Sequence, residues 1–172
     1  MTRGRRDRPE RPARYAYLAA GNATQARKRV AVDLLIRDAA GNVLLVDPTY
    51  KEHWDLPGGM AEPNEAPRVA GVREVREELG LDVTAGRLLL VDWVGPHGPW
   101  DDHIVFIFDG GTLDRYTVEH LTVTDPELAG HRFVPLAETT SLLRPDVAPR
   151  LQQAHESLIA GGVAYDELDR TW

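Results

Sequence analysis

One segment near the middle of the chain constrains the fold more than any other. From Asn64 to Leu79 its apolar residues return with the period of an α-helix, at i, i+3, i+6 and i+10. These residues are Val69, Val72, Val75 and Leu79. Pro67 suits the first turn of a helix and Gly80 suits its end. The pattern predicts an amphipathic helix over residues 64–79 that packs one side on a core.

The opposite side of this helix carries three acids, Glu74, Glu77 and Glu78. Like charges one turn apart cost an isolated helix about 0.2–0.5 kcal/mol per pair. Mg²⁺ and Mn²⁺ prefer oxygen ligands and would remove this repulsion. A solvated acidic face, paired in the ordinary way with Arg73 and Arg76, is the competing interpretation of these residues taken alone.

The residues around the helix decide between the two interpretations. From Gly59 to Leu81 the chain matches the pattern G-x5-E-x7-R-E-U-x-E-E-x-G-U, where U is a bulky aliphatic residue, at every fixed position. In this segment, called the box below, the chain resembles the Nudix hydrolase family. The order of the flanking elements extends the resemblance from about residue 28 to residue 160. The resemblance implies a metal-dependent enzyme that cleaves the pyrophosphate bond of a nucleotide-type substrate.

Strand-like runs and a second helical stretch surround the box. Strands are expected at residues 30–36, 43–46, 88–94, 104–108 and 133–136, and a closing helix at 145–159. Strands interleaved with two helices indicate an α/β fold with helices layered on a central sheet. The resemblance sharpens this to a Nudix-type α/β/α sandwich with a central mixed sheet. We expect residues 29–172 to form this domain and residues 1–28 to form a basic, flexible leader without regular structure.

The resemblance also implies roles for the acids and for Arg73. Glu74, Glu77 and Glu78 would ligate one to three Mg²⁺ or Mn²⁺ ions, and Glu77 and Glu78 would thereby act in catalysis. Arg73 would hold a glutamate in place, most simply Glu77 one turn further on. Glu65 would brace the loop and the helix from behind the ligands.

A glycine pair, Gly58 and Gly59, precedes the box helix. Glycine lets the backbone approach a ligand closely because no side chain intervenes. We therefore expect this pair to bind the phosphates of the substrate. The resemblance adds a backbone carbonyl of Gly58 or Gly59 as a further metal ligand.

The general base is open at this stage. The resemblance places it either on a box glutamate or on an acid in a later loop. Glu127 precedes the expected strand at 133–136 and is the candidate for the loop acid. Its rivals are Asp101, Asp102 and Glu119.

The loop at residues 94–103 is rich in Gly, Pro and Trp. Trp100 is a candidate for stacking on a base or ribose, and a rigid connector with Trp100 on the core is the alternative. Pro96 stands fifteen residues after Leu81. A proline at this distance from the box resembles the pattern of the ADP-ribose pyrophosphatase subgroup. ADP-ribose or another nucleotide sugar is therefore slightly favoured over a modified nucleoside triphosphate.

Composition bounds the remaining function classes. Residues 1–29 hold nine Lys and Arg against two acids, so the rest of this chain of net charge −7 is strongly acidic. An acidic body disfavours a nucleic-acid groove. A 5′-pyrophosphate hydrolase whose leader contacts RNA, and a catalytically silent nucleotide sensor, remain alternatives.

The chain has no cysteine and no stretch of about 20 apolar residues. We expect a cytoplasmic protein without membrane contact, and a homodimer stays open.

Overall fold

Seven strands form one mixed sheet in the computed structural model, which describes residues 12–168. The strands are β1 (Arg29–Arg37), β2 (Val43–Pro48), β3 (Gly58–Met60), β4 (Leu88–Val94), β5 (His103–Thr112), β6 (Leu128–Val134) and β7 (Ala164–Leu168). Their order is β6-β2-β1-β5-β4-β7, and β3 pairs with β1 off this path. The pairs β1–β5 and β4–β7 are parallel, and the remaining pairs are antiparallel.

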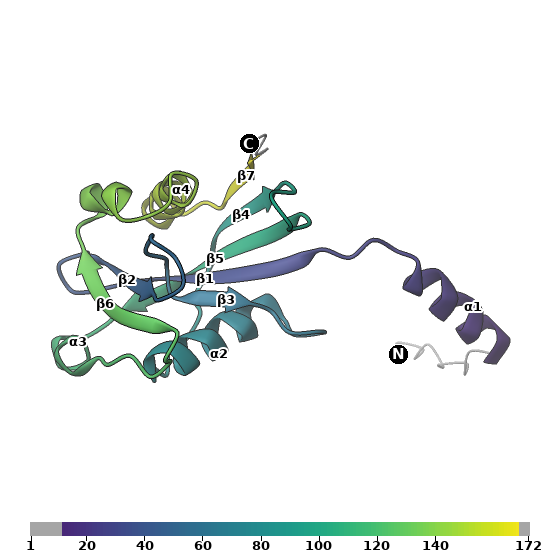
Figure 1. Ribbon diagram of the computed structural model, residues 1–172, viewed down its shortest axis with the longest axis horizontal. Coiled ribbons are helices and arrows are strands. Elements are labelled where there is room, and N and C mark those ends of the chain that lie inside the picture. Colours follow the sequence, from purple (N-terminus) through teal and green to yellow (C-terminus); the bar gives the residue numbers. More distant parts are fainter. Residues whose placement is uncertain (1–11, 169–172) are drawn as a thin grey trace, which may run out of the picture.

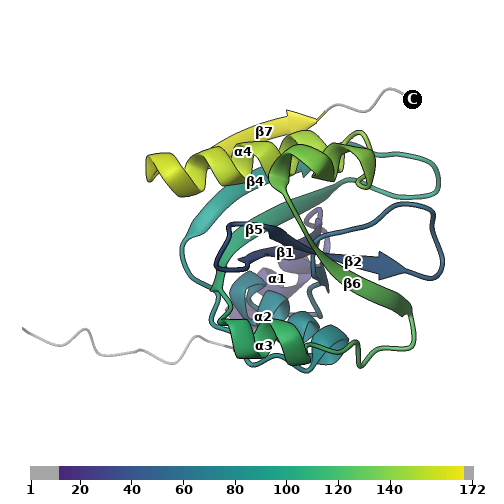
Figure 2. The same cartoon turned by 90° about the vertical axis from the view of Figure 1, so that its left-hand side faces the viewer.

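Helices lie on both faces of this sheet. The helices of the described chain are α1 (Pro12–Ala23), α2 (Pro67–Leu79), α3 (Arg115–His120), a 3₁₀ helix (Leu136–Ser141) and α4 (Val147–Ala160). Figure 2 shows α4 on one face and α2 on the other, which confirms the predicted layered α/β fold. Within the described part of the chain, no helix is long and apolar enough to cross a membrane.

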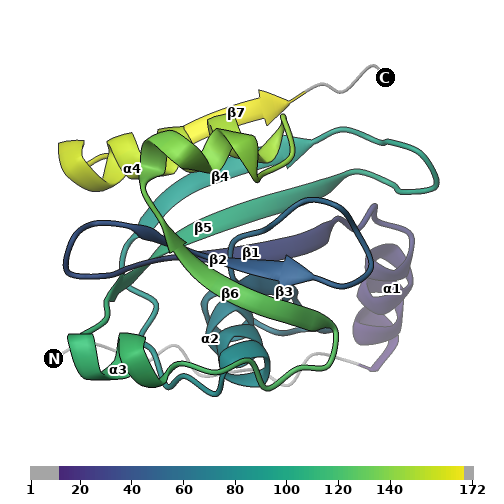
Figure 3. The ribbon, with the colours of Figure 1, turned by 60° about the vertical axis from the view of Figure 1, so that its left-hand side comes forward.

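The central strand β1 connects two hydrophobic cores. Leu35 belongs to the core under α4, whereas Val32 and Leu34 belong to the core under α2. All three side chains are fully buried, because successive residues of a strand point to opposite faces and both faces are covered. Figure 3 shows β1 in the middle of the sheet. The end of β1 next to β3 is where the box enters the fold.

The box helix α2 is close to its predicted extent. It begins at Pro67, and Gly80 ends it in the left-handed conformation at φ 63°, with its N–H donating to the carbonyl of Arg76. The predicted apolar stripe is only partly correct, because Val69 is 58% exposed. The helix instead approaches the sheet at Gly71, where an added Cβ would lie 2.9 Å from Val32 Cγ1. With the helix backbone close to the sheet at Gly71, the first turn of the helix, which carries Val69, faces outward.

Several predicted boundaries need correction. The strand predicted at 133–136 runs from Leu128 to Val134, and it ends because Pro135 lacks an N–H for the ladder. The sequence does not predict the short elements β3, α3, the 3₁₀ helix and β7. The leader, predicted to lack regular structure, contains α1, although residues 1–11 lie outside the described range. Figure 1 shows α1 standing apart from the sheet.

Candidate active site

The glycine pair brings two box glutamates against the backbone of β3. The N–H of Gly58 donates to Glu78 Oε2 at 3.0 Å. An added Cβ on Gly59 would lie 2.5 Å from Glu74 Cδ, so any larger residue there would displace the carboxylate of Glu74. Gly58 has φ 150°, and an added Cβ there would lie 2.2 Å from the carbonyl oxygen of Val32. Backbone atoms of β1 thus require a glycine at position 58, and Gly59 leaves room for the present position of the Glu74 carboxylate.

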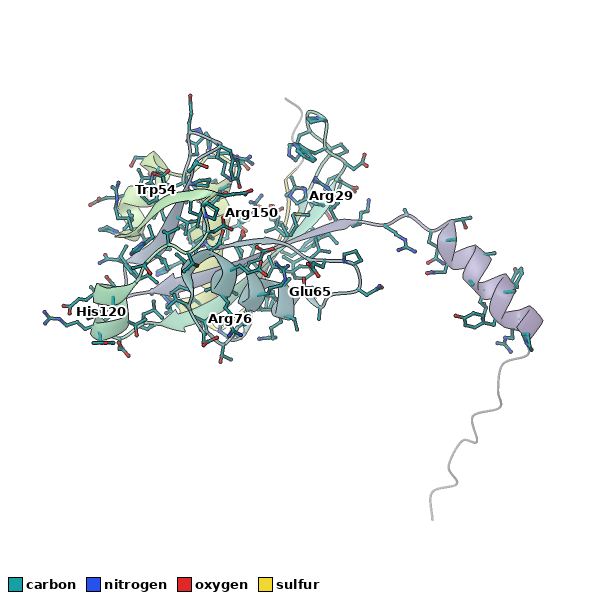
Figure 4. The ribbon with its side chains drawn as sticks, turned by 60° about the horizontal axis from the view of Figure 1, so that its bottom comes forward. Arg29, Trp54, Glu65, Arg76, His120 and Arg150 are labelled. Carbon is teal, nitrogen blue, oxygen red and sulfur yellow. The ribbon has the colours of Figure 1, made fainter. Side chains whose placement is uncertain are left out.

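Arg73 joins the acids of the box to the loop before α2. It donates to both carboxylate oxygens of Glu65 at 2.9 Å, to Glu74 and Glu77 at 3.0 Å, and to the carbonyl of Met60 at 3.1 Å. The expected contact with Glu77 is thus present, but the two-point contact with Glu65 is the stronger one. Figure 4 labels Glu65 on the side of the body from which the chain leads to α1. Arg73 and Glu65 together hold the loop against the helix.

The pKa of Glu65 and the pKa values of Glu74 and Glu78 are shifted in opposite directions. The hydrogen bond from Arg73 lowers the pKa of Glu65. Burial raises the pKa of Glu78 to about 8, and the nearby charges of Glu74, Asp33 and Asp125 raise it further. Burial also raises the pKa of Glu74. A raised pKa means that too little positive charge lies near the ionised carboxylate to compensate it. A bound cation would supply this charge.

The donors fit a hard divalent cation. All candidate ligands are carboxylate or backbone oxygens, the donors that Mg²⁺ and Mn²⁺ prefer. Within residues 12–168, no three acidic or histidine side chains already converge as a preformed cage. The carboxylate of Glu77 accepts from Arg73 at 3.0 Å. Its side chain is 56% exposed, more than that of Glu74. Joint ligation by the three box glutamates stays a prediction.

Asp33 is an acid of this region that sequence reasoning missed. It pairs with Gly58 across β1 and β3, and its Oδ1 would lie 2.9 Å from a Cβ added to that glycine. Burial and the charge of Asp55 raise the pKa of Asp33 to about 7. The signal was available in the sequence, because Asp33 is the single charged residue inside the apolar run 30–36. A strand that is buried on both faces carries a carboxylate only where something compensates it.

The loop acids are arranged differently from the prediction. Glu127 is exposed, and its backbone carbonyl accepts from Thr49 N at 2.8 Å and Thr49 Oγ1 at 3.0 Å. The loop instead contacts α2 through Thr124, whose N–H donates to the Glu78 carbonyl at 2.8 Å. The neighbouring Asp125 is half-buried, and its charge reaches Glu78. Asp125 is therefore the loop acid that the fold brings to the box.

The other rivals lie elsewhere. Asp102 binds Lys28 and accepts from Trp93 Nε1 at 2.9 Å. Asp101 is exposed in the same loop. Glu119 pairs with Arg115 at 2.6 Å on the exposed helix α3. The contacts of Asp102 and Glu119 are structural ion pairs, and neither contact involves a box residue.

Trp100 contacts Arg29, which lines a hollow beside the box loop. The hollow measures about 680 Å³ and is lined by residues 27–30 and 60–65. Arg29 is one of its lining residues, and the guanidinium of Arg29 lies 5.0 Å from the centre of the Trp100 ring. Trp100 is 55% exposed, which argues against the alternative that it packs on the core. Its role in binding a base or ribose stays a prediction.

The raised pKa of Glu78 predicts how the metal-free protein responds to pH. The folded state holds the Glu78 proton up to about pH 8, whereas the unfolded chain releases it near its ordinary pKa of about 4.3. Ionisation of Glu78 therefore removes stability as pH rises from about 5 to 8. The measurement compares the melting temperatures of Glu78→Gln and of the wild type in chelator. We expect the difference, variant minus wild type, to grow over this range and to level off above pH 8. A constant difference would contradict the buried environment of Glu78.

Known proteins share this fold and this segment. The family model of the NUDIX domain matches residues 27–161. The chain is 40% identical over 78 residues to 8-oxo-dGTP diphosphatase of Proteus vulgaris, across 43% of this chain and 67% of that protein. It is 44% identical over 64 residues to diphosphoinositol polyphosphate phosphohydrolase 3-alpha of Homo sapiens, across 37% of this chain and only 39% of that protein.

A solved structure gives the same result for the fold. The MutT protein from Methanosarcina mazei Go1 matches with a TM-score of 0.65 at 23% identity, across 78% of this chain and 99% of that chain. At this identity the likeness concerns the fold alone. The family model matches most of the chain, and the sheet and helices resemble those of this solved structure. The chain therefore belongs to the Nudix hydrolase family.

Proposed function

We propose that this chain is a divalent-metal-dependent pyrophosphohydrolase acting on a nucleoside diphosphate linked to another group. One observation carries the proposal: Glu74 and Glu78 are packed against the backbone of Gly58 and Gly59. Burial raises the pKa values of both acids at this point of the backbone, where a bound divalent cation would supply positive charge. Two relatives of the chain, a diphosphatase and a phosphohydrolase, support the same reaction class.

The residues divide the chemical work as follows. Glu74, Glu77 and Glu78 would hold Mg²⁺ or Mn²⁺ with a carbonyl of Gly58 or Gly59. A metal bound there would neutralise charge on the pyrophosphate and lower the pKa of a coordinated water. Arg73 keeps Glu74 and Glu77 oriented, and its contact with Glu65 fixes Arg73 in turn.

A proton acceptor for the attacking water is supplied by a carboxylate near Glu78. The geometry supports Asp125 over Glu127 in this role, because the loop residues 124 and 125 are the ones that dock on α2. A box glutamate is the competing acceptor.

Two observations favour two different chemical classes for the group beyond the pyrophosphate. Pro96, exposed in the loop that carries Trp100, favours ADP-ribose or another nucleotide sugar. The likeness to 8-oxo-dGTP diphosphatase favours a modified nucleoside triphosphate. The hollow beside the box loop is large enough for either type of group. Initial rates on ADP-ribose, a UDP-sugar and 8-oxo-dGTP at equal concentration separate these classes.

Metal removal tests the proposal as a whole. In excess chelator we expect hydrolysis of each substrate in this panel to fall to the uncatalysed rate, because the clustered carboxylates repel an anionic substrate. Adding Mg²⁺ or Mn²⁺ beyond the chelator should restore the rate. Phosphate release measured with and without metal gives the result. Undiminished hydrolysis in chelator would overturn the proposed mechanism.

A further inference from the structure

The hollow beside the box loop has three consecutive cations in its wall. One wall is the segment 27–30, which leads into β1, and the other is the box loop at residues 60–65. The volume of about 680 Å³ lies within the range of roughly 300–1,000 Å³ that small-molecule pockets have. The three cations are Arg27, Lys28 and Arg29.

Two of the charges around this hollow are already compensated by partners. Lys28 binds Asp102, a residue of the loop that carries Trp100. On the opposite wall, both carboxylate oxygens of Glu65 accept hydrogen bonds from Arg73 at 2.9 Å. The electrostatic character of the hollow is therefore decided by its remaining charged residues.

The remaining charges are mainly positive. Within residues 12–168, Arg27, Arg29 and Glu62 line the hollow without forming an ion pair. Two guanidinium groups against one carboxylate leave a local excess of positive charge. Most of this chain is acidic, because the net charge is −7 although residues 1–29 are basic. A local positive excess in an acidic body directs an anion to this place.

Arg29 is held in a fixed position but lacks one hydrogen-bond acceptor. It donates to the carbonyl of Asp101 at 2.9 Å, and its guanidinium lies 5.0 Å from the centre of the Trp100 ring. Its Nε is buried, and no described residue accepts a hydrogen bond from it. Figure 4 labels Arg29 at the end of the body from which the chain leads to α1. A phosphate oxygen would supply the missing acceptor, since guanidinium groups bind phosphate at two points.

The hollow begins where the backbone of the box leaves the candidate metal site. In the pairing of β1 with β3, Gly59 lies opposite Val32. Met60 is the next residue and already lines the hollow. From Val32 back to Arg29 the strand β1 spans about 10 Å. This separation suits a group that belongs to the same substrate molecule but lies outside the pyrophosphate.

We propose that Arg27 and Arg29 bind a phosphate group of the substrate that is separate from the pyrophosphate. The inference rests on the proposed function, because it assigns the substrate to one chemical class, nucleotide derivatives that carry an additional phosphate monoester. A phosphate at Arg29 would lie next to Trp100, the residue predicted to stack on a base or ribose. One phosphorylated nucleoside would therefore reach both residues.

Two pairs of substrates that differ by one such phosphate test the proposal. NADPH has a 2′-phosphate that NADH lacks, and coenzyme A has a 3′-phosphate that dephospho-coenzyme A lacks. All four contain a pyrophosphate bond. With Mg²⁺, we expect the kcat/KM of the wild type to be at least about tenfold higher for the phosphorylated member of one or both pairs, the size of one charge-assisted hydrogen bond. Equal kcat/KM within both pairs would overturn the proposal.

Variants of the two arginines locate the phosphate. Arg27→Gln and Arg29→Gln should each remove most of the preference, whereas Arg29→Lys, which keeps the charge, should retain part of it. Arg115→Gln is the matched control, because Arg115 pairs with Glu119 on the exposed helix α3, and it should keep the full preference. A preference that survives both glutamine changes at positions 27 and 29 would refute the assignment.

Binding of ligands that cannot be hydrolysed separates this subsite from the reaction. Adenosine 2′,5′-bisphosphate, adenosine 3′,5′-bisphosphate and AMP contain no pyrophosphate bond, and calorimetry with Mg²⁺ present measures their Kd. We expect at least one bisphosphate to bind about tenfold more tightly than AMP, and Arg29→Gln to abolish the difference. Tighter binding by a chain that hydrolyses none of the substrates named above would retain the subsite and overturn the proposed function. Equal binding by a chain that hydrolyses them would do the reverse.

Discussion

Replacing Glu78 with glutamine is expected to lower turnover by roughly 10²-fold or more, the largest effect of any single change in the box. A metal ion contributes several kcal/mol of charge stabilisation, and each 1.36 kcal/mol is about tenfold in rate. Glutamine keeps the shape and one oxygen of Glu78, so the contact with the Gly58 N–H at 3.0 Å can persist. The loss is therefore one of charge rather than of packing.

The metal dependence of this variant distinguishes ligation from other roles. If Glu78 is a ligand, the Mn²⁺ concentration for half-maximal rate should rise, and excess Mn²⁺ should recover part of the turnover. Glu119→Gln is a suitable control, because Glu119 is an exposed acid paired with Arg115 outside the box. Near-normal turnover and metal dependence in Glu78→Gln would exclude Glu78 from the metal site.

The second large effect is expected at the loop acid. Asp125→Asn should lower turnover by roughly 10²–10⁴-fold, the usual contribution of a general base. The half-saturating metal concentration should stay close to that of the wild type, and added metal should not restore the rate. Glu127→Gln, in the same loop, should be nearly neutral, because the structure gives Glu127 a contact with Thr49 through its backbone only.

The pH–rate profile separates this role from a structural one. If Asp125 is the base, its loss should remove the acidic limb of the profile, whereas a positioning defect would lower the curve without changing its shape. A large loss in Glu127→Gln with normal Asp125→Asn would restore the original prediction for Glu127. Normal rates in both variants would transfer the role to a box glutamate.

The local parts of this site could be predicted because their chemistry lies within one short segment. The helical period, Pro67 and Gly80 delimit α2 almost correctly, and the spacing from Arg73 to Glu77 brings the two into contact. Close approach at Gly58 and Gly59 was expected for the phosphates of a substrate, and this stays a prediction; in the structure it is the carboxylate of Glu74 that lies against Gly59.

The remainder depends on contacts between residues far apart in the chain. Asp33 reaches the site only because β1 pairs with β3, and Asp125 reaches it only because its loop returns to the end of α2. The strand β7 forms by pairing with β4, more than 70 residues earlier. Val69 matched the period of the apolar stripe but is exposed, because the position of closest approach was set by Gly71. No local pattern encodes these pairings.

Direct binding of Mn²⁺, followed by its electron paramagnetic resonance signal, tests the assignment of the metal site to the box glutamates. The wild type should bind Mn²⁺ with loss of the free-ion signal, and Mg²⁺ should compete for the site. Glu74→Gln and Glu78→Gln should each weaken this binding by roughly tenfold or more, while Glu119→Gln should bind as the wild type does. Equal binding by the wild type and both box variants would contradict the central role given to Glu74 and Glu78.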